Sequence, residues 1–251
     1  CAHAPREATG NDGGMRVVTW NVLHRIHALN WDEASVAAYP DESRRCDAIA
    51  LQVAGWLRGD VDVVCLQEVS GDQLDAVRSA VGGAVHVAQH RHSREPRLRA
   101  AVPSPLRRPA EFLVTLTKLE HESVSAEAFD EDGGKGVLVV RLSSGVTVLN
   151  THVTFGAKRV AQLELLSARL VAPSVLMGDF NAPLDVVMTE LGAVSCSDLR
   201  GQLPTRFGKS ASDGQHIDHV IGRGVRVVDA TVLDVGAWSD HRPVWAHVEF
   251  E

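Results

Sequence analysis

The sequence has neither a long hydrophobic run nor an excess of positive charge. No apolar stretch approaches the roughly 18–20 residues that a membrane-spanning helix needs, which excludes a membrane span. The 251 residues carry 25 Lys and Arg against 32 Asp and Glu, a formal net charge of −7. This balance excludes a broadly basic surface that coats nucleic acid. A phosphate-bearing substrate stays possible, because a divalent metal held by carboxylates supplies positive charge locally.

Cysteine is also scarce, with Cys1, Cys46, Cys65 and Cys196 and no CxxC spacing. Such cysteines are typical of free thiols in a reducing cytosol, so we expect a cytoplasmic protein. Cys1 leaves an alternative open, because it could be the lipidated first residue of a processed lipoprotein that is lipid-anchored or exported. Residues 1–14 are polar and rich in glycine, and we expect a flexible N-terminal extension or a cloning remnant there.

What is present is the composition of an ordinary globular chain, with 45% hydrophobic and 23% charged residues. Hydrophobic periodicity predicts helices over 43–58, 72–80 and 157–170. Short apolar runs predict strands over 16–21, 62–67, 112–117, 123–129, 137–142, 146–151, 174–177, 217–221, 225–233 and 244–250. Residues 24–42 and 86–109 are predicted as loops, and 130–136 as a turn. Hairpins mixed with helix-separated strands indicate two packed sheets covered by helices.

Polar residues stand at the carboxyl ends of several buried strands, and one acid lies inside a strand pattern. Because such groups are costly to bury without partners, we expect them to converge on one pocket. Carboxylate and amide oxygens with imidazole, and no thiolate, suit Mg²⁺ or Mn²⁺ better than zinc. The residues are Asn21, Glu68, His152, Asp179, Asn181, Asp218, Asp240 and His241.

Six segments resemble the ordered motifs of the endonuclease/exonuclease/phosphatase superfamily. Each piece alone is weak, but six in the correct order span nearly the whole chain from about residue 16 to 250. They are TWNVL (19–23), CLQEV (65–69), LNTHV (149–153), MGDFNA (177–182), HIDHV (216–220) and WSDHRPV (238–244). The deadenylase-like branch is the most similar. The chain departs from AP endonucleases at Leu23 and His152, and from the family's Gly-containing strand at EFLVTLTK (111–118).

The resemblance implies an α/β fold, a four-layer sandwich in which two mixed β-sheets pack face to face and are flanked by helices. It implies a single catalytic domain over residues 15–251, because the motif order brings both ends of the chain into one pocket. It also implies a metal site in which Glu68 is the principal ligand of Mg²⁺ (or Mn²⁺), with Asn21 and Asp240 nearby. The metal would neutralise the phosphate and stabilise the leaving oxygen.

The same resemblance implies the catalytic groups. Asp179 would orient or deprotonate the attacking water, and Asn181 would hold that water or the phosphate. His241, fixed by Asp218, and His152 would donate to phosphoryl oxygens. The expected reaction is in-line attack of water on phosphorus.

The substrate is less specified by the sequence. We expect a nuclease or nucleotide phosphodiesterase, with a phosphomonoesterase, a phospholipid or inositol-phosphate hydrolase, and a catalytically silent scaffold as alternatives. No obligate protein partner is inferred. In the Arg/His-rich stretch 86–109, Arg91, Arg94 and Arg97 are candidates for binding substrate phosphates, unless the stretch is a solvated insertion. Base stacking needs exposed aromatics, for which Trp31, Tyr39 and Trp238 are candidates. The spacings His24-x-x-His27, His90-x-His92 and His216-x-x-His219 are predicted to be incidental, and DGGKG (132–136) a turn.

Overall fold

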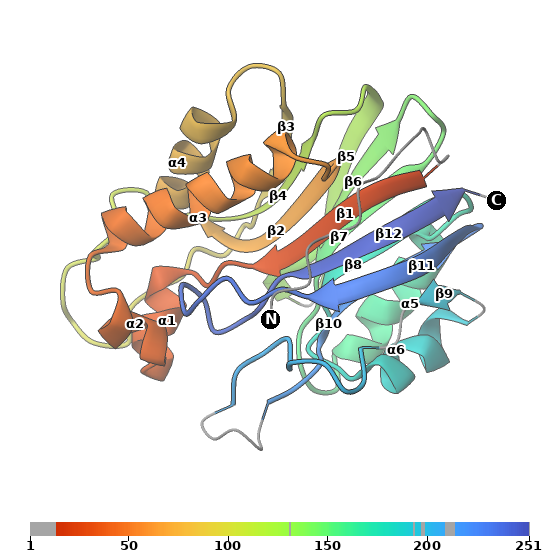
Figure 1. Cartoon of the computed structure of the whole chain (residues 1–251). Helices are drawn as coiled ribbons and strands as arrows, with labels where there is room; N and C mark the ends of the chain where they lie inside the picture. Colours follow the sequence, from red (N-terminus) through yellow and green to blue (C-terminus); the bar gives the residue numbers. More distant parts are fainter. Residues whose placement is uncertain (1–13, 131, 193, 197–198, 209–213, 251) are drawn as a thin grey trace.

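Two six-stranded β-sheets form the centre of the computed structural model, which describes residues 14–130, 132–192, 194–196, 199–208 and 214–250 (Figure 1). The first sheet has the order β11 (Val225–Val232), β12 (Val244–Phe250), β1 (Gly14–Asn21), β2 (Val63–Ser70), β4 (Glu111–Thr117) and β3 (His86–Arg91). The second has the order β5 (His121–Phe129), β6 (Asp132–Leu142), β7 (Thr147–His152), β8 (Ser174–Asp179), β10 (Asp218–Arg223) and β9 (Ser195–Cys196). Both sheets are mixed, because β1 and β2 run parallel, as do β7 and β8, among antiparallel neighbours.

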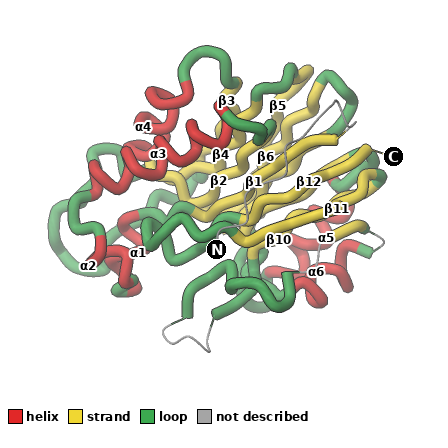
Figure 2. The backbone as a smooth tube through the Cα atoms, in the orientation of Figure 1, coloured by secondary structure: helices red, strands yellow, loops and turns green. Residues whose placement is uncertain are grey.

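Helices cover the outer face of each sheet (Figure 2). On the first sheet lie α3 (Glu42–Arg58) and α4 (Gly71–Val81), whose apolar faces pack on β1, β2 and β4. On the second lie α5 (Arg159–Arg169) and α6 (Leu184–Leu191), which pack on β7 and β8. A third apolar cluster, rich in valine, fills the space between the sheets. The predicted four-layer sandwich is therefore confirmed. Among the described residues, none of the helices is long and apolar enough to span a membrane.

Some predicted boundaries were wrong. The loop predicted over 24–42 contains two short helices, α1 (Arg25–Trp31) and α2 (Ala34–Ala38), which are too short to show a clear periodicity. Residues 132–136 begin β6 instead of forming a turn, because Gly136 pairs with His152. The elements α6 and β9 were not predicted. The extension predicted over 1–14 lies outside the described residues, apart from Gly14 at the start of β1.

The stretch 86–109, predicted as a loop, begins with a strand. Residues 86–91 form β3, which pairs antiparallel with β4 from His86 opposite Thr117 to Arg91 opposite Phe112. The histidines and arginines hid an alternating pattern in which Val87 packs towards the helices and Ala88 towards the other sheet. Because β4 supplies hydrogen-bond partners for the backbone, tertiary pairing outweighs the polar composition here.

Arg45 of α3 is a buried cation that ties the helix to the loops at the end of the sandwich. Its side chain is 1% exposed, and its guanidinium donates to the carbonyls of Val22 (2.9 Å), Leu23 (2.8 Å) and Trp238 (2.7 Å). Glu42 lies 2.7 Å away and balances the charge. Arg45 thereby joins the segment after β1 to the segment before β12.

We expect Arg45→Met to lower the free energy of unfolding by about 3–5 kcal/mol, because it removes the nearest cation from the largely buried Glu42 and the guanidinium donor from the carbonyls of Leu23 and Trp238. Urea denaturation monitored by circular dichroism measures the change. The control is Arg44→Met, whose side chain is 86% exposed and should shift stability by at most about 1 kcal/mol. Equal stability of the two variants would contradict the structural role of Arg45.

Candidate active site

The predicted site residues meet at one end of the sandwich, where the strands of both sheets end. Register explains part of this: His152 is the partner of Asp179 on β8, and Asp179 is the partner of Asp218 on β10. Asn21 and Glu68 end or nearly end the parallel strands β1 and β2 of the facing sheet. The segment before β12 is hydrogen-bonded to the end of β1. The Ser239 hydroxyl donates to the Asn21 carbonyl (2.7 Å), and the Trp20 indole donates to the His241 carbonyl (3.0 Å).

Asp179 lies at the centre of this cluster and is 2% exposed. Its Oδ2 accepts from Asn21 Nδ2 (3.1 Å) and lies 3.3 Å from His152 Nε2 and 3.8 Å from His241 Nε2. Its Oδ1 accepts from the backbone N–H of Asn181 (2.9 Å). Burial raises the pKa of Asp179, but the charges of His152 and His241 outweigh it and hold the pKa well below its usual range. Asp179 is therefore a buried, ionised carboxylate.

Asp218 and His241 form a buried acid–imidazole pair beside Asp179. His241 Nδ1 lies 2.8 Å from Asp218 Oδ2, which directs its Nε2 towards Asp179. Burial alone would lower the pKa of His241, but the charges of Asp218, Asp240 and Asp179 raise it to about 10. His241 is therefore an imidazolium near neutral pH, and a donor.

Glu68 occupies a strained position at an irregularity in the pairing of β2 with β4. Its φ is +56°, and Leu23 (+55°) and Asn181 (+48°) beside the site share this left-handed conformation. Non-glycine residues adopt it at a cost, and such strain clusters at functional sites. Glu68 Oε2 accepts from the backbone N–H of His24 (3.2 Å). Burial raises the pKa of Glu68, but the charges of His27, His152 and Lys135 lower it to about 2.

The three predicted metal ligands differ in their surroundings. Asn21 Oδ1 accepts from the Leu23 backbone, while its Nδ2 bonds to Asp179. Asp240 is 8% exposed, and its Oδ2 lies 3.4 Å from Nε of Arg206. Burial raises the pKa of Asp240, and the charge of Glu68 adds to this.

Within the described ranges, the one compact group of possible metal ligands is a different set. Asp179, Asp218 and His241 each offer an atom within 4.8 Å of the others, and all three are buried. However, Asp218 and His241 already bond to each other through Oδ2 and Nδ1. The prediction that Asn21, Glu68 and Asp240 hold the metal stays a prediction.

Lys135 of β6 is a site residue that the sequence did not reveal. Its Nζ lies 3.0 Å from His152 Nδ1 and also contacts Nε2 of the same ring. Its charge also contributes to the lowered pKa of Asp179 and of Glu68. The surrounding glycines indicated a turn, which hid this residue. In the strand that forms instead, side chains alternate between the two faces, so Lys135 lies on the same face as Val137.

A second unexpected contact links α1 to β4. His27 Nε2 lies 2.8 Å from Glu111 Oε2, and Glu111 is buried. Glu111 stands in the segment EFLVTLTK, where the chain departs from the family pattern. The histidine pairs predicted to be incidental do not enter the compact ligand group found among the described residues.

The three arginines predicted to bind substrate are exposed, but two of them are engaged. Arg91 lies 3.3 Å from Glu95, and Arg94 lies 3.0 Å from Asp132. The backbone carbonyl of Arg97 accepts from Asn30, which leaves its guanidinium exposed. Substrate binding by these residues stays a prediction.

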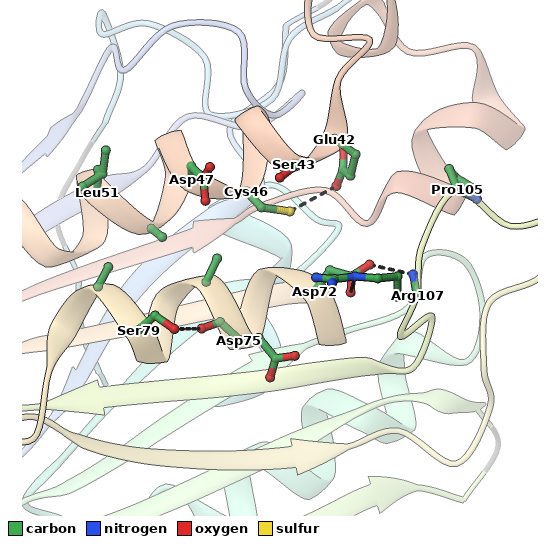
Figure 3. A pocket seen from close by; sticks show the side chains of 13 residues that line it. Glu42, Ser43, Cys46, Asp47, Leu51, Asp72, Asp75, Ser79, Pro105 and Arg107 are labelled. Carbon is green, nitrogen blue, oxygen red and sulfur yellow. Dashed lines mark hydrogen bonds and ion pairs between the residues drawn. The ribbon is translucent and has the colours of Figure 1, made fainter.

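A groove of about 790 Å³ lies between α3 and α4 (Figure 3). Its lining includes the carboxylates of Glu42, Asp47, Asp72 and Asp75 and none of the predicted site residues. The groove therefore lies apart from the candidate active site.

Comparison with known proteins identifies the family. The sequence profile of the Endonuclease/Exonuclease/phosphatase family matches residues 18–241, and the chain therefore belongs to this family. Membership indicates a hydrolase of phosphoester bonds, since the family includes phosphodiesterases and nucleases. No curated protein sequence matches the chain.

Several solved structures share the fold. The endonuclease/exonuclease/phosphatase from Bacteroides vulgatus is 15% identical with a TM-score of 0.70, covering 95% of this chain and 99% of that one. TDP2 from D. rerio, complexed with single strand DNA product, is 14% identical with a TM-score of 0.66, covering 95% and 100%. The endonuclease/exonuclease/phosphatase from Beutenbergia cavernae is 19% identical with a TM-score of 0.65, covering 94% of this chain and 72% of that one. At these identities the similarity establishes the fold, whereas function depends on the site.

Proposed function

We propose that residues 15–251 form a single catalytic domain that hydrolyses a phosphodiester in a Mg²⁺- or Mn²⁺-dependent reaction, as a nuclease or nucleotide phosphodiesterase. The observation that carries the proposal is the position of Asp179. It is a buried, ionised carboxylate surrounded by the amide of Asn21 and the imidazoles of His152 and His241. This arrangement provides an acceptor for a water molecule next to donors for a phosphoryl group.

Asp179 orients the attacking water in this proposal. A general base works best when its pKa lies near the working pH. Because the pKa of Asp179 is held below its usual range, its carboxylate binds a proton weakly and serves better as a hydrogen-bond acceptor that aligns the water. Asn181 is held beside it, since its Nδ2 donates to the Val153 carbonyl (2.9 Å) and lies 3.4 Å from His152 Nε2.

The positive groups bind the phosphoryl oxygens. His241 presents a charged Nε2 near Asp179 Oδ2, and Lys135, which contacts His152, adds a second positive group to the site. Charged donors that are already oriented stabilise the charge that develops on phosphoryl oxygens in the transition state.

Glu68 and Asp240 fit a hard divalent cation. Both carboxyls are largely buried, and the pKa of Glu68 is lowered to about 2, so it stays ionised. Buried carboxylates are costly unless a cation compensates them. Asn21, which donates to Asp179, would lie next to this metal site. The metal, when bound, supplies Lewis-acid stabilisation of the phosphate and the leaving oxygen.

A substrate panel tests the proposed function. Single-stranded RNA, single-stranded DNA, a nucleotide monoester and a phospholipid are each incubated with Mg²⁺, with Mn²⁺ and with a chelator. We expect metal-dependent cleavage of a nucleic acid or nucleotide diester. Hydrolysis of the monoester or the phospholipid alone would overturn the proposed substrate class, and absence of any turnover would favour a binding scaffold.

Asp218 gives a pH-dependent prediction. His241 is a donor only while protonated, so activity should be present below its pKa of about 10 and decline as the pH rises through that value. Asp218→Asn removes a charge that raises this pKa, so the alkaline decline should move to lower pH. The kcat–pH profile measures the shift, with Asp47→Asn on the exposed face of α3 as control. An unchanged alkaline limb would show that Asp218 does not act through His241.

A further inference from the structure

One face of α1 leads away from the candidate metal site. The helix begins after His24, whose backbone N–H donates to Glu68 Oε2 (3.2 Å). His27, Asn30 and Trp31 follow with the i, i+3, i+4 spacing that places side chains on the same face. At 1.5 Å per residue, Trp31 lies about 10 Å along the axis from His24. In Figure 1, α1 lies just beyond the carboxyl end of β1.

His27 is the first group on this face. Its side chain is 29% exposed, and its Nε2 is held by the buried Glu111 at 2.8 Å. Although burial opposes the charged form, Glu68 and Glu111 favour it, so the pKa of His27 is raised. The imidazole is therefore partly exposed and oriented by Glu111, and the proposed hydrolysis does not use it.

Asn30 and Trp31, further along the helix, contact residues 97–99 of the Arg/His-rich stretch 86–109. Asn30 Nδ2 donates to the Arg97 carbonyl and Asn30 Oδ1 accepts from the Arg99 backbone, both at 2.9 Å. The Arg99 guanidinium donates to the Asn30 carbonyl (3.2 Å) and lies 4.1 Å from the centroid of the Trp31 ring. Trp31 is nevertheless 57% exposed. A large aromatic ring that is exposed and is held in place by a cation over one face can stack against a nucleic-acid base.

We propose that this face of α1, with Arg97 and Arg99, is the track on which a single-stranded nucleic acid extends from the catalytic site. A phosphate neighbouring the reacting one binds His27, an unpaired base stacks on Trp31, and the arginines bind the following phosphates. The inference rests on the proposed function and adds the substrate class. Stacking on an exposed ring requires an unpaired base, which favours a single strand over a duplex. Arginine forks match phosphate oxygens.

Binding is tested separately from cleavage. Each variant is made in an Asp179→Asn background, and the anisotropy of fluorescein-labelled RNA and DNA of about 12 nucleotides is measured, within the range of known single-strand sites. We expect Trp31→Ala and Arg99→Ala each to weaken binding about tenfold, as the loss of one stacked base does. The RNA and DNA arms show which sugar is preferred. A matched duplex should bind more weakly than the single strand.

The controls remove an exposed apolar side chain and an exposed arginine that lie away from the track. Leu29→Ala lies on α1 but off this face and is 38% exposed, and Arg44→Ala lies on α3 with its side chain 86% exposed. Both should bind like the parent. Unchanged affinity of the Trp31 and Arg99 variants, or a duplex that binds as tightly as the single strand, would overturn the proposal that a single strand binds along this face of α1.

A kinetic comparison distinguishes loss of strand binding along the track from a general structural effect of the substitution. It also distinguishes both from failure of the proposed function. With Asp179 intact, Trp31→Ala should lower kcat/KM for the oligonucleotide at least about tenfold more than for bis(p-nitrophenyl) phosphate, a small diester that cannot reach Trp31. Equal losses on both substrates would show a structural effect and overturn the track. If the unmodified protein hydrolyses neither substrate, the proposed function fails, while the anisotropy results still decide whether the strand binds.

Discussion

Asp179→Asn should lower kcat by about 10³-fold, within the range expected for loss of a group that acts on the attacking water. The replacement keeps the shape of the side chain and an oxygen for the Asn181 N–H. It removes the charge that faces His152 and His241. The water would then lose its anionic acceptor, and the two imidazoles their common counter-charge.

The measurement is kcat at saturating substrate and metal, together with a thermal melt that shows whether the variant is folded. Asp47→Asn makes the same chemical change on the exposed face of α3 and should leave kcat unchanged. Wild-type kcat in folded Asp179→Asn would exclude the proposed mechanism.

Glu68→Gln is expected to weaken Mn²⁺ binding at least about 100-fold and to reduce activity correspondingly, because the proposed principal ligand loses its charge. Isothermal titration with Mn²⁺ measures the affinity without any substrate. The side chain remains the same size, and its Oε can still accept from the His24 N–H.

Asp218→Asn is the matched comparison for the position of the ion. Asp218 belongs to the compact group with Asp179 and His241, but its Oδ2 already bonds to His241. We expect Asp218→Asn to retain Mn²⁺ affinity within about threefold, much less than the loss at a coordinating residue. The opposite order, with Mn²⁺ lost in Asp218→Asn and retained in Glu68→Gln, would place the ion in the compact group.

The sequence was informative where polar residues interrupt apolar runs. Asn21, His152 and Asp179 stand out because a buried strand seldom ends in a group that needs a partner. Strand register brings His152 to Asp179, whereas Asn21 comes from the facing sheet. The two-sheet architecture was predictable for the same reason, since period-two and period-3.6 patterns separate strands from the longer helices.

Contacts between distant segments could not be predicted in this way. His27 and Glu111 are 84 residues apart, and neither has a neighbour that indicates the pairing. Lys135 lies among glycines that hide the alternation of β6. The arginines and histidines around β3 suggested solvated loop, although backbone pairing with β4 determines the structure there. These features depend on tertiary packing, which overrides local preference.

The place of β12 has a consequence for the order in which the enzyme is made. This strand lies between β11 and β1, and the residues just before it bring His241 and Asp240 to the first strand. During translation, Glu68 and Asp179 emerge and begin to fold well before residues 238–250 exist. A growing chain on the ribosome therefore carries six of the eight predicted site residues before Asp240 and His241 are made, and the site is complete only when the last strand is in place.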